Sequence, residues 1–399
     1  MTRDTKNKTA ETAVGEDTSA ETSAVSSRRK FLTATGAAAV GGTAAIAFPN
    51  VSRAETTTWT MQSGWPSGDI FHEFAADYVG FVNEMSGGRM QINLLPSGAV
   101  VGALEIQDAI IGGALDGGHG VSAYWYGKDK TASLFGTPPS YGWNGNQFLG
   151  WMKYGGGQEL YDELVQEVLG MDLVGFLTGP MPTQALGWFT EPIRGVDQLE
   201  GMRYRTVGLA ADLMEEFGAA VTILGGADIV PALDRGVIDG AEFNNPSSDR
   251  FLGFQDVAKH WMLQSYHQDC EAFEISFNKT KFEGLPDEVQ AILKHAGEAA
   301  SSDMSWKAMD RYPDAQRDLV ENHGVNLYIT PDEILDAQLQ AWDTVIERNS
   351  AENPFFGRVI ESQREWAREV VGFDIVNEAP KERAYRHFFG EPPLPAEKL

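Results

Sequence analysis

The chain has 399 residues, with 57 Asp and Glu against 31 Lys and Arg, which gives a formal net charge of −26. Such an acidic balance repels phosphate backbones and anionic membrane surfaces, so it argues against nucleic acid as a partner. The single cysteine, Cys270, excludes an intrachain disulfide, and the sequence has no Cys/His cluster with zinc spacing.

A basic stretch followed by a short apolar stretch marks the N-terminus. Residues 27–32 read Ser-Arg-Arg-Lys-Phe-Leu and precede an Ala-, Gly- and Thr-rich stretch over 33–48. That stretch is too short to span a bilayer, and the small residues Ser52 and Ala54 suit a cleavage site. We therefore predict a twin-arginine signal peptide with a polar N-terminal extension over residues 1–54, and hence a periplasmic or extracytoplasmic protein.

The sequence after residue 54 alternates strand and helix patterns. Alternating side chains predict a strand over Thr57–Gln62, helical periodicity predicts a helix over Ile70–Met85, and Met90–Leu95 has the pattern of the next strand. The same rhythm continues downstream and predicts an α/β fold with helix-covered sheets. Further elements are expected as two helices within 146–169 broken at Gly155–Gly157, strands over Leu173–Thr178, Met202–Thr206 and Val221–Leu224, and a helix over Leu209–Phe217.

Two distant segments resemble each other in register. Residues 105–117 align without gaps on residues 228–240, and each copy has the pattern of a short helix, a glycine cap, an Asp-Gly turn and a strand. Two copies of one unit predict two lobes of similar build. The alignment also places His119 and Glu242 at equivalent positions, near where a strand enters the space between the lobes.

The C-terminal third has a different pattern, with long amphipathic helices. They are expected over Pro286–Asp310, Asp332–Asn349 and Phe356–Val371, with Trp306, Trp342 and Trp366 buried on their apolar faces and a loose tail after Pro392.

Catalytic signatures are missing from the sequence: there is no GxGxxG after a strand, no P-loop, no HExxH and no GxSxG. Polar residues near aromatic ones are more informative, namely Gln184, Arg205 and Glu242. Arginine can hold a carboxylate through two parallel hydrogen bonds, and the other two side chains offer oxygen ligands suited to Na⁺ or Ca²⁺. Taken singly, each residue also has a structural alternative: Gln184 as a loop cap, Arg205 in a surface ion pair and Glu242 as a solvated turn residue.

Three runs of sequence carry a resemblance to a known family. They are Gln-Ala-Leu-Gly-Trp-Phe at 184–189, Gln-Leu-Glu-Gly-Met-Arg-Tyr-Arg at 198–205, and the stretch from Gly225 to Glu242. Together they resemble the solute receptors of tripartite ATP-independent periplasmic (TRAP) transporters, most closely the branch that binds 2-oxo acids or lactate. The resemblance extends from Thr57 to about Phe373.

This resemblance implies a bilobed periplasmic-binding-protein-like α/β fold with hinge strands and long C-terminal helices. It implies that Arg205 binds the ligand carboxylate, and that Gln184, Glu242 and the carbonyl of Phe243 coordinate a cation, Na⁺ or Ca²⁺, bound with the ligand; no organic cofactor is expected. It also implies membrane subunits of a TRAP transporter as partners and a homodimer formed through the C-terminal helices. Asn244 and Asn245 depart from the branch, which tends to have small or apolar residues there, and so bear on the size and polarity of the pocket.

The expected ligand-binding set is completed by His119 and Tyr124. We expect lobe I over 55–178 and 275–310, lobe II over 179–274, and C-terminal helices and a tail over 311–399. The predicted function is capture of a 2-oxo or 2-hydroxy monocarboxylate, such as pyruvate or lactate, for a permease. The alternatives are a receptor for a dicarboxylate, a sugar acid or ectoine, and a secreted enzyme with Glu242 or His119 as general base.

Overall fold

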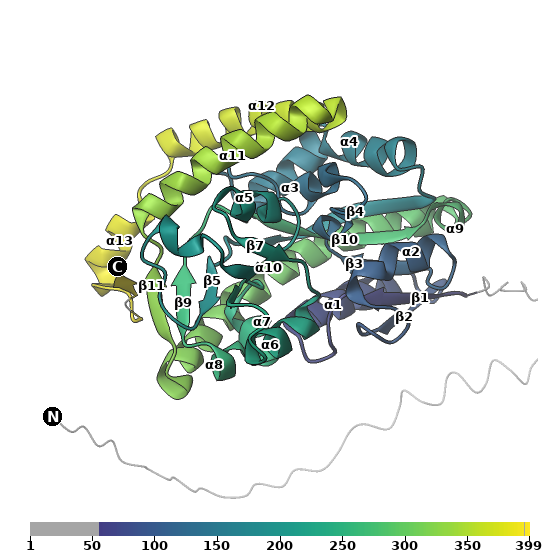
Figure 1. Cartoon of the computed structure of the whole chain (residues 1–399). Coiled ribbons are helices and arrows are strands. Elements are labelled where there is room, and N and C mark those ends of the chain that lie inside the picture. The colour runs from purple at the N-terminus through teal and green to yellow at the C-terminus, as the bar shows by residue number, and fades with distance from the viewer. Residues whose placement is uncertain (1–55, 395) are drawn as a thin grey trace, which may run out of the picture. The chain divides into compact units, whose positions relative to one another are not determined.

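The computed structural model describes residues 56–394 and 396–399, in which two β-sheets are covered by helices (Figure 1). The signal peptide predicted over 1–54 lies outside the described residues. None of the described helices is both long and apolar enough to cross a membrane.

The first sheet has, within the described residues, the strand order β2-β1-β3-β10-β4. Its strands are β1 (Thr57–Ser63), β2 (Met90–Leu95), β3 (Gly117–Gly120), β4 (Leu173–Met181) and β10 (Glu271–Asn278). β1 pairs in parallel with β2 and β3, whereas β10 runs antiparallel between β3 and β4. All residues of β10 are buried, because helices cover both faces of the sheet at this strand.

The second sheet has the order β12-β11-β9-β5-β8-β6-β7 in the described part of the chain. Its strands are β5 (Gly187–Phe189), β6 (Arg203–Arg205), β7 (Ala220–Thr222), β8 (Gly240–Ala241), β9 (His260–Leu263), β11 (Asn326–Ile329) and β12 (Glu397–Lys398). The first sheet lies to the right in Figure 1 and the second to the left. We call each sheet with the helices packed on it a lobe, and the predicted bilobed α/β fold is confirmed.

Short helices connect the strands, as the sequence predicts. They are α1 (Ile70–Met85), α2 (Ile106–Ile111), α3 (Gly145–Tyr154), α4 (Gly157–Glu163), α5 (Ala210–Glu216), α6 (Gly226–Asp234), α7 (Pro246–Leu252), α8 (Phe254–Val257) and α9 (Lys279–Glu283), with 3₁₀ turns at Ala103–Glu105, Ser122–Trp125, Lys130–Phe135 and Val196–Leu199 and a π-helical turn at Leu164–Val168. α1 begins at an Asp69 cap whose carboxylate accepts from the N–H of Phe71.

The repeated segments have the same local structure. α2 leads to β3 in the first sheet and α6 leads to β8 in the second, so the predicted helix–turn–strand unit is confirmed in both copies. Each helix is followed by a glycine in the left-handed region, Gly113 at φ 76° and Gly236 at φ 64°. A side chain is disfavoured in that conformation, which explains why both copies have glycine there.

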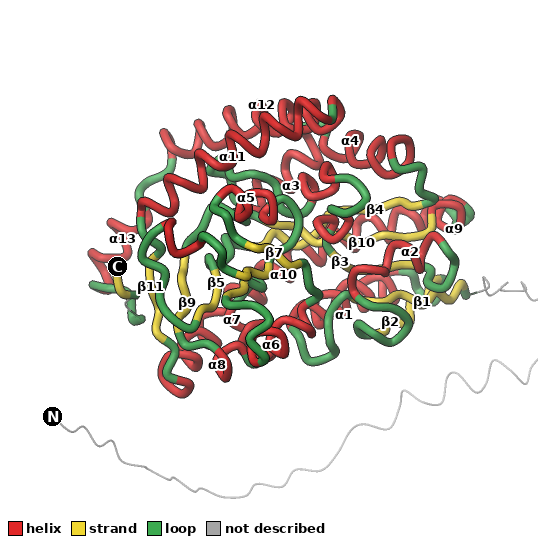
Figure 2. The backbone as a smooth tube through the Cα atoms, in the orientation of Figure 1, coloured by secondary structure: helices red, strands yellow, loops and turns green. Residues whose placement is uncertain are grey.

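Long helices form the C-terminal third, and those over residues 332–377 extend along the upper edge of Figure 2. They are α10 (Asp287–His323), α11 (Asp332–Glu352) and α12 (Pro354–Asn377), followed by the shorter α13 (Lys381–Phe389). α10 contacts β4 of the first lobe and α7 of the second. α12 packs on α3 and α4 of the first lobe, and α11 packs on α5 of the second, so these helices connect the two lobes.

Some predictions for this region are wrong. α10 continues past its expected end at Asp310 and includes Pro313, and Trp306 is 66% exposed because its face of α10 points to solvent. Trp342 is buried as predicted and Trp366 is half-buried. The tail is not loose throughout, because β12 pairs with β11.

The predicted lobe boundaries differ in detail from the sheets. The boundaries after residues 178 and 274 fall inside β4 and β10, both of which lie in the first sheet. β11, within the segment 311–399, belongs to the second sheet because it pairs with β9. The assignment of whole segments to lobes stays a prediction.

Candidate functional site

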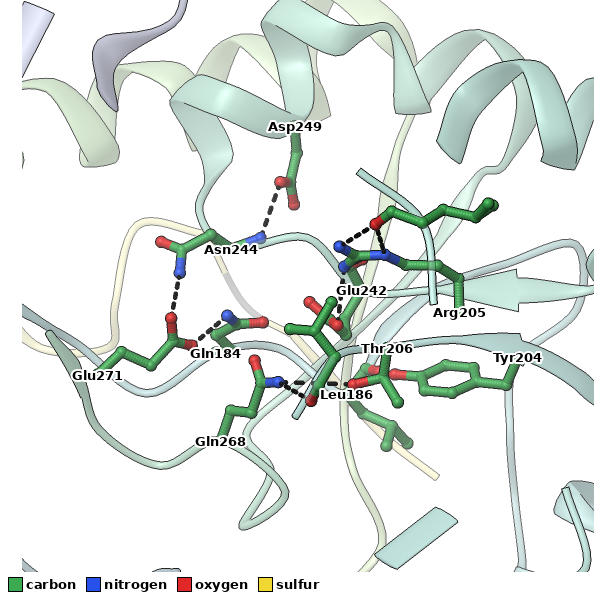
Figure 3. A network of polar contacts seen from close by, with 12 residues as sticks. Gln184, Leu186, Tyr204, Arg205, Thr206, Glu242, Asn244, Asp249, Gln268 and Glu271 are labelled. Carbon is green, nitrogen blue, oxygen red and sulfur yellow. Dashed lines mark hydrogen bonds and ion pairs between the residues drawn. The ribbon is translucent and has the colours of Figure 1, made fainter. Parts of the chain in front are cut away.

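A small cavity lies between the lobes and is lined by residues of both. Its volume is about 20 Å³, enough for about one or two water molecules. Its lining consists of Trp65, Phe71, Val121, Tyr124, Thr137, Met181, Gln184, Arg205, Val207, Phe243, Asn244, Glu271 and Phe273. The wall is therefore mostly aromatic or aliphatic, with a small group of polar side chains that Figure 3 shows from close by.

Arg205 is the positive group of this cavity. It ends β6, and its side chain is 1% exposed. Nε and Nη2 donate to the carbonyl of Leu224 at 3.0 and 2.7 Å, and Nη1 donates to the backbone carbonyl and to Oε1 of Glu242, each at 2.8 Å (Figure 3). A guanidinium has five N–H groups, so one on Nη2 makes no hydrogen bond to the described residues.

Arg203, two residues earlier on the same strand, has a different environment. It is exposed and donates to Asp239 and to the carbonyl of Gly236. It is therefore placed outside the cavity, and Arg205 is the arginine that lines it.

Gln184 lines the cavity, whereas Glu242 is not among the lining residues and lies beside Arg205, to which it is bonded. Both are almost fully buried. Oε1 of Glu242 accepts from Arg205, while its Oε2 has no hydrogen-bond partner in the part of the chain that the structure describes. Nε2 of Gln184 donates to Glu271, and its Oε1 is likewise without a partner among the described residues. Two buried oxygens without donors suit a hard cation such as Na⁺ or Ca²⁺, because such ions are bound by oxygen ligands.

Glu271 is the polar residue of the cavity that the sequence analysis missed. It begins β10 and is 4% exposed. Its Oε1 accepts from Gln184, and its Oε2 accepts from Nδ2 of Asn244 at 3.1 Å. A signal was present in the sequence, because an acidic residue directly before a strand of buried side chains needs a partner or a proton.

The two carboxylates titrate unusually. Burial raises the pKa of Glu242, although Arg205 opposes this effect. Burial, with the charge of Glu242 added, raises the pKa of Glu271 well above its ordinary value. Two carboxylates and one guanidinium therefore leave the cavity with excess negative charge at high pH unless a proton or a cation is bound.

The other predicted site residues divide into those in the cavity and those behind it. Phe243 lines the cavity, with its ring 5.9 Å from the guanidinium carbon of Arg205. Tyr124 also lines it, and burial raises the pKa of its hydroxyl to about 12, so this hydroxyl keeps its proton as a donor. Asn244 lines it through the amide that binds Glu271.

His119 lies behind the cavity wall and is not among the lining residues, so its role in ligand binding stays a prediction. Its ring packs 5.0 Å from Trp65 and 4.8 Å from Phe273, centroid to centroid, and those two residues line the cavity in its place. Burial lowers its pKa to about 3, so the imidazole is neutral. The repeat places His119 on β3 and Glu242 directly after β8 at equivalent positions, and neither lines the cavity, but Glu242 is bonded to Arg205, which does.

Clusters of three or more His, Cys, Asp or Glu side chains that could hold a metal are not found among the described residues. A cation at this cavity would therefore depend on amide and carbonyl oxygens besides Glu242 and Glu271. Gln184 supplies such an oxygen.

Two α/β lobes with a small polar cavity between them define a ligand-binding protein of the two-lobed class. Residues 61–353 match the model of the bacterial extracellular solute-binding protein family 7 (DctP), and the chain belongs to this family. The family resemblance predicted from the three sequence runs is confirmed. The family is one of periplasmic solute-binding proteins for transport.

Individual relatives agree with this. The chain is 28% identical over 320 residues to a monocarboxylate 2-oxoacid-binding periplasmic protein of Nostoc, covering 80% of this chain and 86% of that protein. It is similar to a TRAP solute-binding protein of Pseudoalteromonas atlantica with bound sodium and pyruvate (26% identity, TM-score 0.77, 84% of this chain and 100% of that chain). It is equally similar to one of Bordetella bronchiseptica, a mixed-occupancy dimer with calcium and picolinate (26% identity, TM-score 0.78, 84% and 97%).

Proposed function

We propose that this protein captures a 2-oxo or 2-hydroxy monocarboxylate, such as pyruvate or lactate, together with Na⁺ or Ca²⁺, and delivers it to the membrane subunits of a TRAP transporter. The observation that carries this proposal is the pairing of a buried guanidinium with two buried oxygens that have no donor among the described residues, in the cavity wall or directly beside it. These are Arg205, Gln184 Oε1 and Glu242 Oε2.

Each group has a role in this proposal. Arg205 offers its remaining N–H to the ligand carboxylate, and Tyr124 donates its hydroxyl to a ligand oxygen. Gln184 and Glu242 hold the cation, with the carbonyl of Phe243 as the further ligand that the resemblance implies. The cation supplies positive charge between the protein carboxylates and the ligand carboxylate, which would otherwise repel each other.

The cavity also supports a choice among ligands. Its volume of about 20 Å³ holds only about one or two water molecules, so a ligand must displace the walls, and a three-carbon acid requires a smaller displacement than a hexuronate does. A dicarboxylate would need a second cationic side chain, and Arg205 is the one Lys or Arg among the described residues of the lining. The similar Nostoc protein binds 2-oxoacids and the similar Pseudoalteromonas protein has bound pyruvate, which supports the same class of ligand.

Calorimetric titration tests the proposal. The mature protein is exchanged into a potassium buffer with chelator and titrated with pyruvate, lactate and 2-oxoglutarate, before and after Na⁺ or Ca²⁺ is restored. We expect binding of the monocarboxylates that weakens at least about tenfold without a suitable cation. Affinity that is the same under every cation condition would contradict the cation site.

We further propose that the protein is a receptor and not an enzyme. After incubation with the protein, mass spectrometry should recover pyruvate and lactate unchanged. Conversion of either acid in proportion to protein concentration would support the alternative of a secreted enzyme.

Export by the twin-arginine route is proposed from the sequence. Replacing Arg28 and Arg29 by Lys is expected to leave the precursor inside the cell, while Arg3→Lys exports normally. Normal export of the double variant would contradict the route.

A homodimer through the C-terminal helices is supported by exposed apolar side chains there and by the dimer reported for the Bordetella protein. They are Phe373, Ile375 and Val376 at the end of α12 and Phe388 and Phe389 on α13. Light scattering should give the mass of two chains, which Ile375→Asp halves and which Trp306→Asp, another exposed apolar site, leaves intact.

A further inference from the structure

A second and much larger hollow lies beside the ligand cavity. It is a groove of about 550 Å³. Its lining comes from the segment after β4, the start of α7, the end of β9 and the following loop, α10 and α11: Pro182, Thr183, Ala185, Asn244, Asn245, Pro246, Trp261, Leu263, Gln264, Ser265, Tyr266, Asp269, Tyr312, Pro313, Gln316 and Leu335.

The partition between the two hollows is thin, because neighbouring residues of the same segments face opposite sides. Gln184 lines the ligand cavity while Thr183 and Ala185 line the groove, and Glu271 lines the cavity while Asp269 lines the groove. Asn244 lines both hollows. Its side chain is therefore where the wall is thinnest.

Hydrogen bonds hold Asn244 in this position. Its Nδ2 donates to Oε2 of Glu271 at 3.1 Å, and its Oδ1 accepts from Nδ2 of Asn245 at 3.1 Å. Its backbone N–H donates to Oδ1 of Asp249 at 3.3 Å (Figure 3). Because both ends of the amide are bonded, the side chain is fixed in position between the cavity and the groove.

We propose that Asn244 sets the upper limit on the length of the ligand: its amide closes the cavity towards the groove, and a smaller side chain at 244 admits longer 2-oxo monocarboxylates. This inference rests on the proposed function and names the residue that selects within the ligand class.

The lining of the groove specifies which longer ligands fit. Among its described residues it has no Lys, Arg or His, and it has one acid, Asp269. Burial raises the pKa of Asp269, and its two oxygens accept from the hydroxyls of Ser140 at 2.5 Å and Thr183 at 2.9 Å. Trp261, Leu263 and Leu335 give the groove apolar surface. An uncharged alkyl tail is therefore accepted there, and a second carboxylate is not.

The test compares variants of the partition with variants of each hollow alone. Asn244→Ala and the milder Asn244→Ser open the partition, Gln316→Ala enlarges only the groove, and Val121→Ala enlarges only the ligand cavity on another side. Each mature protein is titrated with pyruvate, 2-oxobutanoate, 2-oxohexanoate and 2-oxoglutarate at saturating Ca²⁺. The readout is the affinity for each acid relative to pyruvate within the same variant, so that a weaker cation site, caused by the lost bond to Glu271, cancels.

We expect the relative affinity for 2-oxohexanoate to rise about tenfold or more in both Asn244 variants, since three added methylene groups leave water. It should stay unchanged in Gln316→Ala, and 2-oxoglutarate should gain in none of the variants. A gain in Val121→Ala with none at position 244 overturns the inference, because the ligand chain then points away from Asn244. Equal relative affinities in every variant overturn it as well, while pyruvate binding by the parent leaves the proposed function standing. A parent that binds no 2-oxo acid overturns both.

Discussion

Replacement of Arg205 by Lys keeps the charge and removes the planar set of donors. From the sequence, an arginine that waits in a cleft for a ligand contributes little to the stability of the ligand-free fold. The structure changes this expectation, because the guanidinium is buried and already bonded to the carbonyl of Leu224 and to Glu242. One substitution should therefore weaken both the fold and ligand binding.

The size of each effect follows from the bonds. The ammonium of Lys replaces the contact with Oε1 of Glu242 but cannot also reach both backbone carbonyls, so at least one or two charged hydrogen bonds are lost, roughly 2–4 kcal/mol of unfolding free energy. For a domain this large, the melting temperature should drop on the order of 5 °C. The N–H of Arg205 that remains for a ligand is lost too, at about 1.5–3 kcal/mol, or roughly 10- to 100-fold in affinity.

Calorimetry of unfolding and of pyruvate binding measures both quantities on the same samples. Arg203→Lys is the matched control on the same strand, because Arg203 makes an exposed ion pair with Asp239 and such pairs contribute about 0–1 kcal/mol. It should melt and bind like the parent. If Arg205→Lys does the same, our account of the cavity is refuted; if it melts earlier but binds pyruvate as well as the parent, Arg205 is structural only.

Three further outcomes are expected. Gly68→Ala directs a Cβ to 2.3 Å from the ring of Phe251 in the other lobe, a clash that should keep the lobes apart and lower pyruvate affinity several-fold. The affinity should recover in the double variant with Phe251→Ala, and no recovery would show that the lobes do not close through this contact. Burial raises the pKa of Asp249 to about 7 from an ordinary 3.8. Between about pH 4 and 7 the folded state therefore holds a proton that the unfolded state releases, and the free energy of unfolding falls as pH rises. Melting curves of Asp249→Asn should show a shallower fall, and an equal slope would contradict this assignment. Burial and the charge of Glu242 raise the pKa of Glu271, and a bound cation favours its deprotonated form, so Ca²⁺ affinity should increase with pH. Titration over a range of pH should show a weaker dependence in Glu271→Gln, and an equal dependence would assign the proton to another group.

Local pattern was sufficient for most elements. α1 and β2 have the predicted bounds. Each segment must bury one apolar face whatever it packs against, so the spacing of its apolar residues indicates the element from sequence alone. The aligned repeats likewise predicted α2–β3 and α6–β8, since a glycine at positive φ and an Asp-Gly turn are local requirements. α10 shows the limit of such reasoning, because it continues through Pro313 to His323, past the expected end at Asp310, and packs against both lobes.

The candidate site divides in the same way. Arg205, Gln184 and Glu242 lie in motifs close enough to known ones for the resemblance to indicate them from sequence. Glu271 and the position of His119 depend on β10, which pairs with β3 and β4 from distant parts of the chain. Which side chains of those strands reach the cavity is set by register between segments that the sequence does not specify locally.

The sequence by itself thus predicted most of the elements, the two-lobed class and five residues that line the cavity, namely Tyr124, Gln184, Arg205, Phe243 and Asn244. Tertiary structure alone decided that Glu271 binds Gln184 and Asn244, that Arg205 is bonded before any ligand arrives, and that Asn244 lies between two hollows. The physical reason is that secondary structure responds to spacing along one segment. Burial, pKa and the thickness of a wall instead depend on which distant segments come within a few ångströms of each other.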